Sequence, residues 1–103
     1  MNEKAENKNQ FSEELSLKLL KNIALTLIRM QKFEESIRVS DDIIEKDKCD
    51  PKGYYLKGQA LMAIHQYEKA KDCFEAGMKL GEVNEIKLAL HNCNKIINSN
   101  KKK

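Results

Sequence analysis

Few side chains in this sequence have the types and spacing that catalysis or metal binding requires. His65 and His91 have no carboxylate or cysteine at the spacing typical of metal ligands. Cys73, His91 and Cys93 would meet only if the last helices pack together, and cysteines on an apolar face are more often small core residues. We find no Ser/His/Asp set and no paired carboxylates that could share a proton. The sequence therefore predicts a protein that is not an enzyme and needs no metal or cofactor.

Two further motifs resemble ligand-binding sequences but lie in the wrong context. Residues 53–59 contain two glycines, yet they lack the Lys-Ser/Thr ending of a phosphate loop and fall inside a predicted helix. Tyr54 and Tyr55 could stack on nucleic-acid bases, but we assign Tyr54 to the core and Tyr55 to a groove. The net charge of +3 equals the charge of the three terminal lysines, 101–103, so the rest of the chain is neutral. We therefore expect neither a nucleic-acid partner nor a membrane partner.

Cysteine usage and the polar N-terminus indicate a reducing compartment. The three cysteines are odd in number and far apart in sequence, and Met1 is followed by polar residues instead of the apolar stretch of a signal peptide. No window of the chain is apolar for long enough to span a bilayer. We expect reduced thiols and a cytoplasmic location.

The elements that would position a binding residue recur along the chain at an offset of 34 residues. Residues 20–27 align with residues 54–61, and the match continues without a gap through Phe33/Tyr67 and Ser36/Ala70. This period is typical of solenoids built from helix-turn-helix repeats. Leu, Ile, Lys and Glu are common in the chain, and one proline and four glycines are too few for turn-rich β architecture. The sequence predicts an all-α fold.

Local signals place the helix ends. Ser12 precedes two acidic residues, Asp50 can cap a helix that begins at Pro51, and Gly81 follows the last apolar residue of another helix. The predicted helices span about 13–30, 33–45, 51–64, 67–80 and 83–97. The predicted domain covers 12–97, with repeats at about 17–50 and 51–84, a capping helix at about 83–97, and disordered tails at 1–11 and 98–103.

Apolar residues in the first and last predicted helices differ in their distribution. The last helix carries one stripe, formed by Ile86, Leu90, Cys93 and Ile97, and has a polar opposite side, as a capping helix requires. The first helix carries apolar residues around much of its circumference. These residues are Leu15, Leu17, Leu19, Leu20, Ile23, Ala24, Leu25, Leu27, Ile28 and Met30. We expect this helix to pack on two sides.

The residues in register resemble the tetratricopeptide repeat. The second repeat carries the pattern Tyr54-x-x-Lys57-Gly58-x-x-Leu61, then Tyr67, then Ala70-x-x-x-Phe74. The first repeat is weaker and reads Leu20-x-x-Ile23-Ala24-x-x-Leu27, then Phe33, then Ser36-x-x-x-Ser40. Lys48 and Glu82 stand where the family usually has a proline. The resemblance covers roughly 13–97 and implies two repeats followed by a capping helix.

Residues 19–24 and 51–58 are similar to the last two repeats of immunophilin co-chaperones of the FK506-binding class. That resemblance implies a carboxylate clamp, in which Lys, Asn and Arg side chains grip the acidic C-terminal tail of a heat-shock chaperone. Asn22 matches the clamp asparagine of the middle repeat, and Lys52 matches the clamp lysine of the last repeat. Leu56 stands where the clamp arginine is expected, and Lys57 points about 100° away from that position.

The predicted function is therefore to hold a peptide segment of a partner protein in a groove. The predicted groove residues are Asn22, Lys52, Tyr55, Leu56, Gln59 and Met62, with Lys18, Lys21 and Arg29 adding positive potential nearby. A first alternative is an apolar groove that includes Leu25, Ile28, Leu56 and Met62 and serves a partner helix or a homodimer. A second alternative is an accessory segment of a peptidyl-prolyl isomerase, taken from a longer protein.

Overall fold

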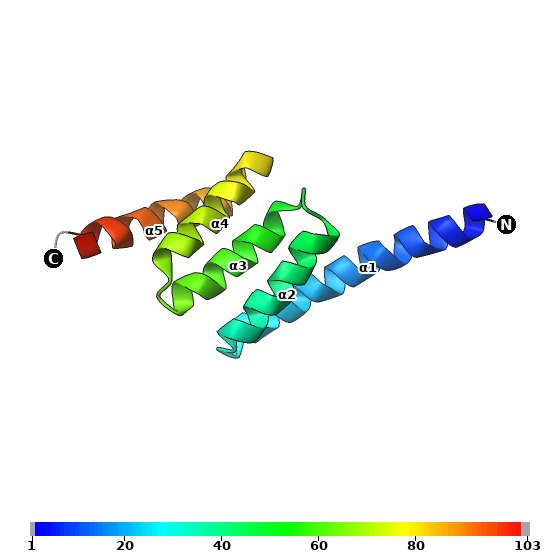
Figure 1. Ribbon diagram of the computed structural model, residues 1–103, viewed down its shortest axis with the longest axis horizontal. Helices are drawn as coiled ribbons and strands as arrows, with labels where there is room; N and C mark the ends of the chain where they lie inside the picture. Colours follow the sequence, from blue (N-terminus) through cyan, green and yellow to red (C-terminus); the bar gives the residue numbers. More distant parts are fainter. Residues whose placement is uncertain (1, 102–103) are drawn as a thin grey trace.

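The computed structural model describes residues 2–101, with side chains described from Glu14 to Lys101, and this part of the chain is all-helical. The five helices are α1 (Asn2–Arg29), α2 (Phe33–Lys46), α3 (Pro51–Ala63), α4 (Tyr67–Leu80) and α5 (Asn84–Lys101) (Figure 1). The prediction of an all-α fold is confirmed.

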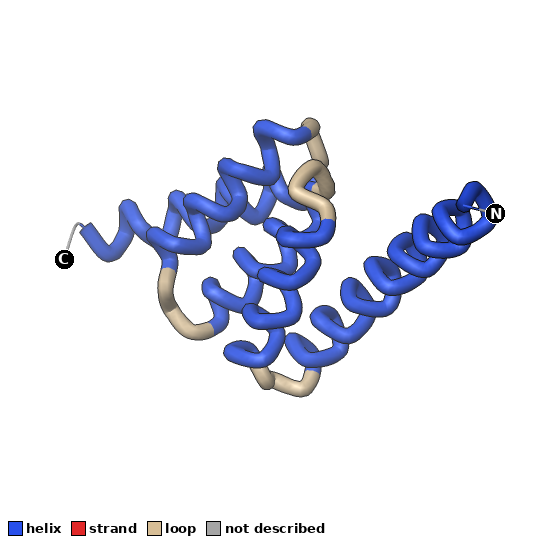
Figure 2. The backbone as a smooth tube through the Cα atoms, turned by 45° about the vertical axis from the view of Figure 1, so that its right-hand side comes forward, coloured by secondary structure: helices blue, strands red, loops and turns tan. Residues whose placement is uncertain are grey.

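Successive helices pack against each other in an elongated array. Each helix contacts the next one along the chain, and in addition α1 contacts α3 and α3 contacts α5. The helices α1, α3 and α5 therefore form one layer, and α2 and α4 form a second. The principal extents are 64 × 28 × 17 Å, because α1 extends well beyond the other helices toward the N-terminus (Figures 1 and 2).

The backbone repeats at the offset found in the sequence. The first residues of α2 and α4, Phe33 and Tyr67, are 34 residues apart, as are their last residues. The turns that precede these helices contain Gln31 and His65, which have φ angles of 64° and 66° and thus share the left-handed conformation that ends a helix. The same hydrogen bond closes both turns, at 2.8 Å in the first and 2.9 Å in the second. The fold is thus a helical hairpin that occurs twice, followed by α5.

Two of the predicted helix boundaries are confirmed in detail. Asp50 precedes α3 in an extended conformation, and its Oδ1 accepts a hydrogen bond from the backbone N–H of Lys52 at 2.9 Å. Pro51 is the first residue of α3, where its missing N–H removes no helical hydrogen bond. Gly81 follows the end of α4 with an extended φ of 169°, so this position does not require glycine.

Helices α1 and α5 are longer than the sequence predicted. Helix α1 begins at Asn2 instead of near Glu13, and α5 continues to Lys101 instead of ending near Ile97. Residues 2–29 contain neither proline nor glycine, so a helix nucleated at the packed part of α1 can extend by adding one hydrogen bond per residue. Residues 98–101 extend α5 in the same way. Met1, Lys102 and Lys103 lie outside the described residues.

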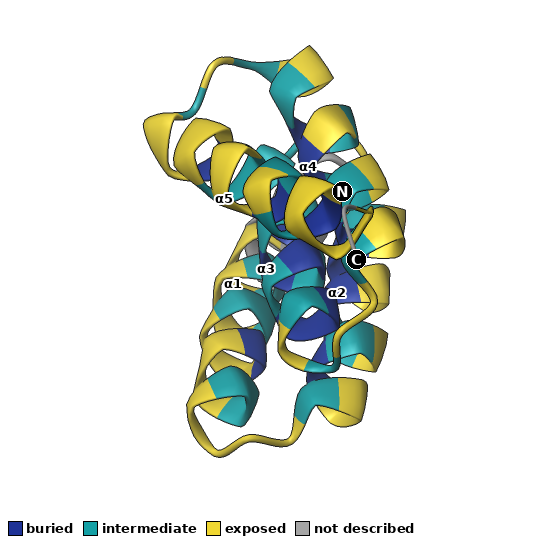
Figure 3. Cartoon of the chain, turned by 90° about the vertical axis from the view of Figure 1, so that its left-hand side faces the viewer, coloured by how far each residue is buried: buried dark blue, intermediate teal, exposed yellow. Residues whose placement is uncertain are grey.

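The main core cluster is built around the second hairpin and α5. Its buried members are Leu61, Ala70, Phe74, Ile86, Cys93 and Ile97. Figure 3 colours the buried residues of the chain dark blue. The Phe74 ring lies directly against the backbone of Gly58, because a Cβ atom placed on Gly58 would be 2.4 Å from the ring. The absence of a side chain at Gly58 is therefore what lets the Phe74 ring pack across α3.

In the first hairpin, smaller residues make the equivalent contact between the two helices. Ala24 and Ser40 occupy the positions equivalent to Gly58 and Phe74, and both are fully buried. The Oγ of Ser36, also buried, donates a hydrogen bond to the carbonyl oxygen of Ala24 at 3.0 Å. A second cluster of buried residues forms here, consisting of Ala24, Ile43 and Leu56.

Between Glu14 and Arg29, where the side chains are described, α1 packs on one side, which corrects the expectation of two packed sides for this part of the helix. Leu17, Leu20 and Ile28 pack against the second cluster. Other apolar residues of α1 and of the turn that follows it remain exposed, by 46% to 56%: Leu15, Leu19, Ile23 and Met30. Their apolar character indicated burial, but the described part of the chain supplies no helix to cover them.

Candidate functional site

The predicted groove residues of α3 lie on one side of that helix. Lys52, Tyr55, Gln59 and Met62 follow one another at steps of three and four residues, which places them on a common face. Lys52 is exposed and the other three are half-buried. Tyr55 and Met62 pack against the main core cluster, and the Tyr55 ring lies 6.4 Å from the Phe74 ring between centroids. The core therefore fixes the apolar part of this face.

Leu56 does not line the groove, which corrects the prediction for this residue. Its exposure is 3%, and it packs with Ala24 and Ile43 in the second core cluster. Leu56 faces the first hairpin because α3 contacts both α1 and α2. Asn22 is the equivalent residue of the first hairpin, and it is exposed on α1. An arginine at position 56 would bury its charge, so the leucine here belongs to the packing of the two hairpins.

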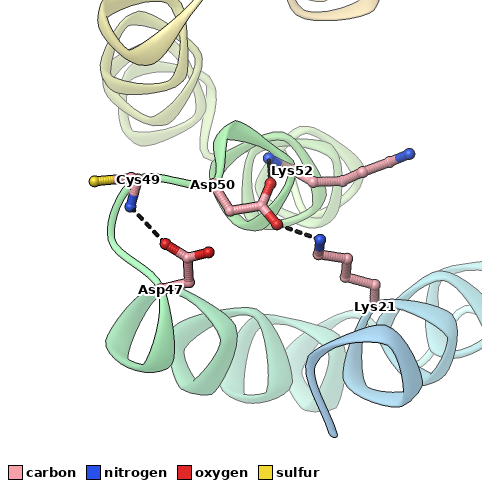
Figure 4. Close-up of polar contacts among 5 residues, drawn as sticks. All are labelled: Lys21, Asp47, Cys49, Asp50 and Lys52. Atoms are coloured by element: carbon pink, nitrogen blue, oxygen red, sulfur yellow. Dashed lines mark hydrogen bonds and ion pairs between the residues drawn. The ribbon is translucent and has the colours of Figure 1, made fainter. Parts of the chain in front are cut away.

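The basic residues near the groove differ in whether an ion pair neutralises their charge. The Nζ of Lys21 forms an ion pair with Oδ2 of Asp50, and Oδ1 of the same carboxylate caps α3 at Lys52 (Figure 4). Partial burial tends to raise the pKa of Asp50, but the hydrogen bonds from Lys21 and from the Lys52 N–H, with both positive charges, bring it below its ordinary value. Asp50 therefore neutralises Lys21, while the Lys52 ammonium makes no ion pair with the described residues.

The remaining predicted residues lie along the solvent side of α1. Lys18, Asn22 and Arg29 are exposed and follow one another at steps of four and seven residues, which places them in one row on the helix. Among the side-chain hydrogen bonds and ion pairs of residues 14–101, none joins this row to Lys52. The structure thus brings together Lys21, Asp50 and Lys52, and leaves Asn22 outside this group.

A cavity of about 240 Å³ lies at the N-terminal end of α3, where the start of α5 approaches it. Its lining comes from Asp50, Pro51, Lys52, Tyr55, Val83, Glu85 and Ile86. The sequence predicted Lys52 and Tyr55 but missed Val83, Glu85 and Ile86. These three belong to α5 and the loop before it, and only the packing of α5 across the second hairpin brings them to Lys52.

The cavity combines an apolar wall with charges of both signs. Tyr55 and Val83 are half-buried and present ring and aliphatic surface backed by the buried Ile86, while the exposed Lys52 and Glu85 supply opposite charges. An apolar side chain of a ligand could be buried here, and a neighbouring carboxylate could reach the Lys52 ammonium. Glu85 makes the surroundings less favourable for a ligand that carries several negative charges close together.

Three larger hollows, of about 530, 530 and 320 Å³, lie away from the predicted groove residues. The first lies between the start of α4 and the end of α5 and includes His65 and Ile97. The second lies over α2, α3 and α4 and includes Lys57 and Cys73, and the third lies at the start of α2 and includes Phe33. We place the candidate site at the smaller cavity, because there apolar surface and the free ammonium of Lys52 converge.

The residues considered for metal binding do not assemble. Cys93 is buried and its Sγ donates a hydrogen bond to the carbonyl oxygen of Tyr67 at 3.2 Å, whereas His91 is exposed. Burial raises the pKa of the Cys93 thiol and of the half-buried Cys73 thiol, which favours the protonated, unreactive form. Cys49 is exposed in the loop before α3 and lies beside Asp47 (Figure 4). Within residues 14–101 no three His, Cys, Asp or Glu side chains are grouped as metal ligands.

Comparison with known protein families adds no identification, since no family model matches the chain. Among the described helices, none has the length and apolar character needed to cross a membrane.

Proposed function

We propose that this chain is a binding module of the tetratricopeptide type, which holds a short segment of a partner protein against α3 and α5. The recurrence of the hairpin at 34 residues supports this proposal, because that is the period of the tetratricopeptide solenoid. The close contact of Phe74 with Gly58 also supports it, since a small residue at that position belongs to the repeat pattern. The proposal gives the chain no catalytic role.

The single observation that carries the proposal is the cavity at Lys52. It offers a ligand a half-buried aromatic ring at Tyr55, half-buried aliphatic surface at Val83, and an ammonium group with no ion-pair partner among the described residues. A peptide that ends in an apolar residue followed by an acidic one matches this arrangement. Its apolar side chain would fill the cavity, and its carboxylate would accept hydrogen bonds from Lys52.

The acidic C-terminal tail of a heat-shock chaperone is the most specific ligand of this class. The resemblance to co-chaperones suggests it, but the clamp is incomplete in this chain. Leu56 is buried, Lys21 is neutralised by Asp50, and Asn22 lies apart from Lys52. We therefore expect weak binding in which one lysine dominates the electrostatic part.

A titration of the protein with a fluorescent acidic-tail peptide tests the proposal. Lys52→Ala should weaken binding about fivefold, which corresponds to about 1 kcal/mol for an exposed charge pair. Lys95→Ala is the matched control, since Lys95 is an exposed lysine of α5 that does not line the cavity. Higher salt should weaken binding to the wild type more than to Lys52→Ala. Equal affinities for the peptide and its C-terminally amidated twin would rule out recognition of the terminal carboxylate.

A partner helix bound to an apolar groove is the second candidate. Leu25 favours it, because this leucine is 38% exposed on α1. An amphipathic helical peptide without an acidic end separates the two candidates. If that peptide binds, and Leu25→Ala weakens it while Lys52→Ala does not, the apolar groove is the site.

A further inference from the structure

The apolar residues that α1 leaves exposed form a continuous face. We call this the outer face of α1, and its members are Leu15, Leu19, Ile23 and Thr26 together with Met30. Met30 directly follows α1, and its N–H still donates a hydrogen bond to the carbonyl oxygen of Thr26 at 2.9 Å, so it continues the helical register. At 100° per residue they fall within an arc of about 80°. The four large apolar members are between 46% and 56% exposed. A patch of this kind on a helix is typical of an interaction surface.

In the second hairpin, the equivalent face of α3 is covered by another helix. Leu19, Ile23, Thr26 and Met30 are equivalent to Gly53, Lys57, Ala60 and Ile64 of the second hairpin, each 34 residues further on, while the equivalent of Leu15 is Cys49 in the loop before α3. That face of α3 is covered by α2, because Gly53 lies against the side chains of Ile43 and Ile44. The Nζ of Lys57 also forms an ion pair with Oδ1 of Asp41 at 2.7 Å.

Since α2 precedes α3 through a short loop, the two helices run in opposite directions (Figure 1). The outer face of α1 therefore corresponds to a position that receives an antiparallel helix. No helix among the described residues occupies that position on α1.

The solvent-exposed side of α5, at the other end of the molecule, is not complementary to the outer face of α1. The side of α5 that faces solvent is mostly polar, and Leu88 is its one large apolar residue with high exposure, at 62%. A head-to-tail contact between copies would therefore set the apolar outer face of α1 against polar residues such as Lys87 and His91. The same face of a second copy is a better match, which is the arrangement of a two-fold dimer.

The spacing of the outer face fits a two-fold axis. Leu15 and Met30 lie equally far from the point between Asn22 and Ile23, and so do Leu19 and Thr26. Two α1 helices placed antiparallel about that point would pair Leu15 of one copy with Met30 of its partner, and Leu19 with Thr26.

The charges at the two ends of the outer face are also complementary. The antiparallel arrangement brings Glu14 at one end of the face close to Arg29 and Lys32 at the other end of the partner's face. All three residues are exposed, so they are free to form ion pairs across the contact.

We propose that two copies of this chain associate through the outer faces of α1, antiparallel, about a two-fold axis between Asn22 and Ile23. This contact is independent of the proposed peptide site, whose residues Lys52, Tyr55 and Ile86 lie on α3 and α5. The outer face spans 16 residues, about the length of the 14-residue α2, so a contact between two such faces is small for a protein interface. We expect a dimer that dissociates on dilution.

Sedimentation equilibrium tests the association. Protein concentrations between about 10 μM and about 1 mM cover the dissociation constants expected of a weak dimer. The wild type should shift from monomer to dimer with concentration. Leu19→Lys combined with Ile23→Lys should remain monomeric with unchanged helical circular dichroism, because both side chains are already about half exposed. Leu88→Lys, a leucine with equal or greater exposure on α5, should dimerise like the wild type. A wild type that is monomeric throughout overturns the proposal, as does loss of the dimer in Leu88→Lys.

Disulfide crosslinking tests the antiparallel two-fold arrangement. In a Cys49→Ser background, which removes the exposed thiol, Ile23→Cys lies near the axis and should crosslink to its own copy. Leu15→Cys should not crosslink to itself but should crosslink when mixed with Met30→Cys. Self-crosslinking of Leu15→Cys would instead indicate parallel helices and overturn the arrangement. Unchanged peptide affinity in the Leu19→Lys/Ile23→Lys variant would show that the two sites are separate.

Discussion

Substituting Gly58 by alanine tests whether Phe74 packs directly on the backbone of α3. The new Cβ would lie 2.4, 2.7 and 2.8 Å from three atoms of the Phe74 ring, which is fully buried. A rigid ring cannot move away as the end of an aliphatic chain can, so overpacking should cost near the upper end of about 1–3 kcal/mol. Alanine recovers about 1 kcal/mol of helix propensity. We expect a net destabilisation of about 1–2 kcal/mol.

Gly77→Ala is the matched control for this prediction. A Cβ on Gly77 would lie 3.1 Å from Cδ1 of Ile86, the flexible end of a side chain, and 3.4 Å from the Cβ of Tyr54. The gain in helix propensity should therefore offset the contact, and the stability of Gly77→Ala should be equal to or above that of the wild type.

Urea denaturation followed by circular dichroism measures the free energy of unfolding of both variants. A destabilisation of 1–2 kcal/mol would also lower the melting temperature by roughly 4–16 °C in a domain of this size. In the smaller Phe74→Leu background, Gly58→Ala should cost about 1 kcal/mol less than in the wild type, since the ring is gone. The reasoning is refuted if Gly58→Ala is as stable as Gly77→Ala.

Two further predictions concern polar groups between the helices. Ser36→Ala should destabilise the protein by about 1 kcal/mol through loss of the hydrogen bond to the carbonyl oxygen of Ala24. Ser40→Ala should be neutral or stabilising, because the buried Ser40 Oγ has no hydrogen-bond partner among the described residues. The pKa of Asp50 is lower in the folded protein than in the unfolded chain, so the ionised carboxylate stabilises the fold at pH values above the pKa that Asp50 has in the unfolded chain. This stabilisation is lost as the pH falls through the lower pKa that Asp50 has in the folded protein. Asp50→Asn should therefore be less stable than the wild type near neutral pH, with the difference vanishing in acid denaturation experiments; a constant difference would contradict this assignment.

Much of the helix arrangement could be predicted because helix starts and the repeat leave recognisable patterns in the sequence. Asp50 and Pro51 together mark the start of α3, and the offset of 34 residues places α2 and α4 in register. The small residue at Gly58 likewise identified the point of close helix approach. The cap and the proline at the start of α3 act within a few residues, while the repeat offset and the small residue at Gly58 were visible because the same pattern occurs twice in the sequence.

The candidate site was harder to predict because its parts come from separate helices. Leu56 and Tyr55 are neighbours in sequence, yet one is buried against the first hairpin and the other lines the cavity. Ile86 was recognised as apolar, but its position beside Lys52 depends on how α5 crosses the second hairpin. The ion pair between Lys21 and Asp50 likewise required the contact between α1 and the start of α3.

The central claim is that a partner peptide binds at the cavity between the start of α3 and the start of α5. Titration of isotope-labelled protein with an acidic-tail peptide, followed by the backbone amide chemical shifts in nuclear magnetic resonance spectra, tests it most directly. The largest shifts should cluster at Lys52, Tyr55 and Ile86, which line the cavity. Shifts that cluster instead at His65 and Tyr67, around the hollow between α4 and α5, or no shifts at a high excess of peptide, would contradict the claim.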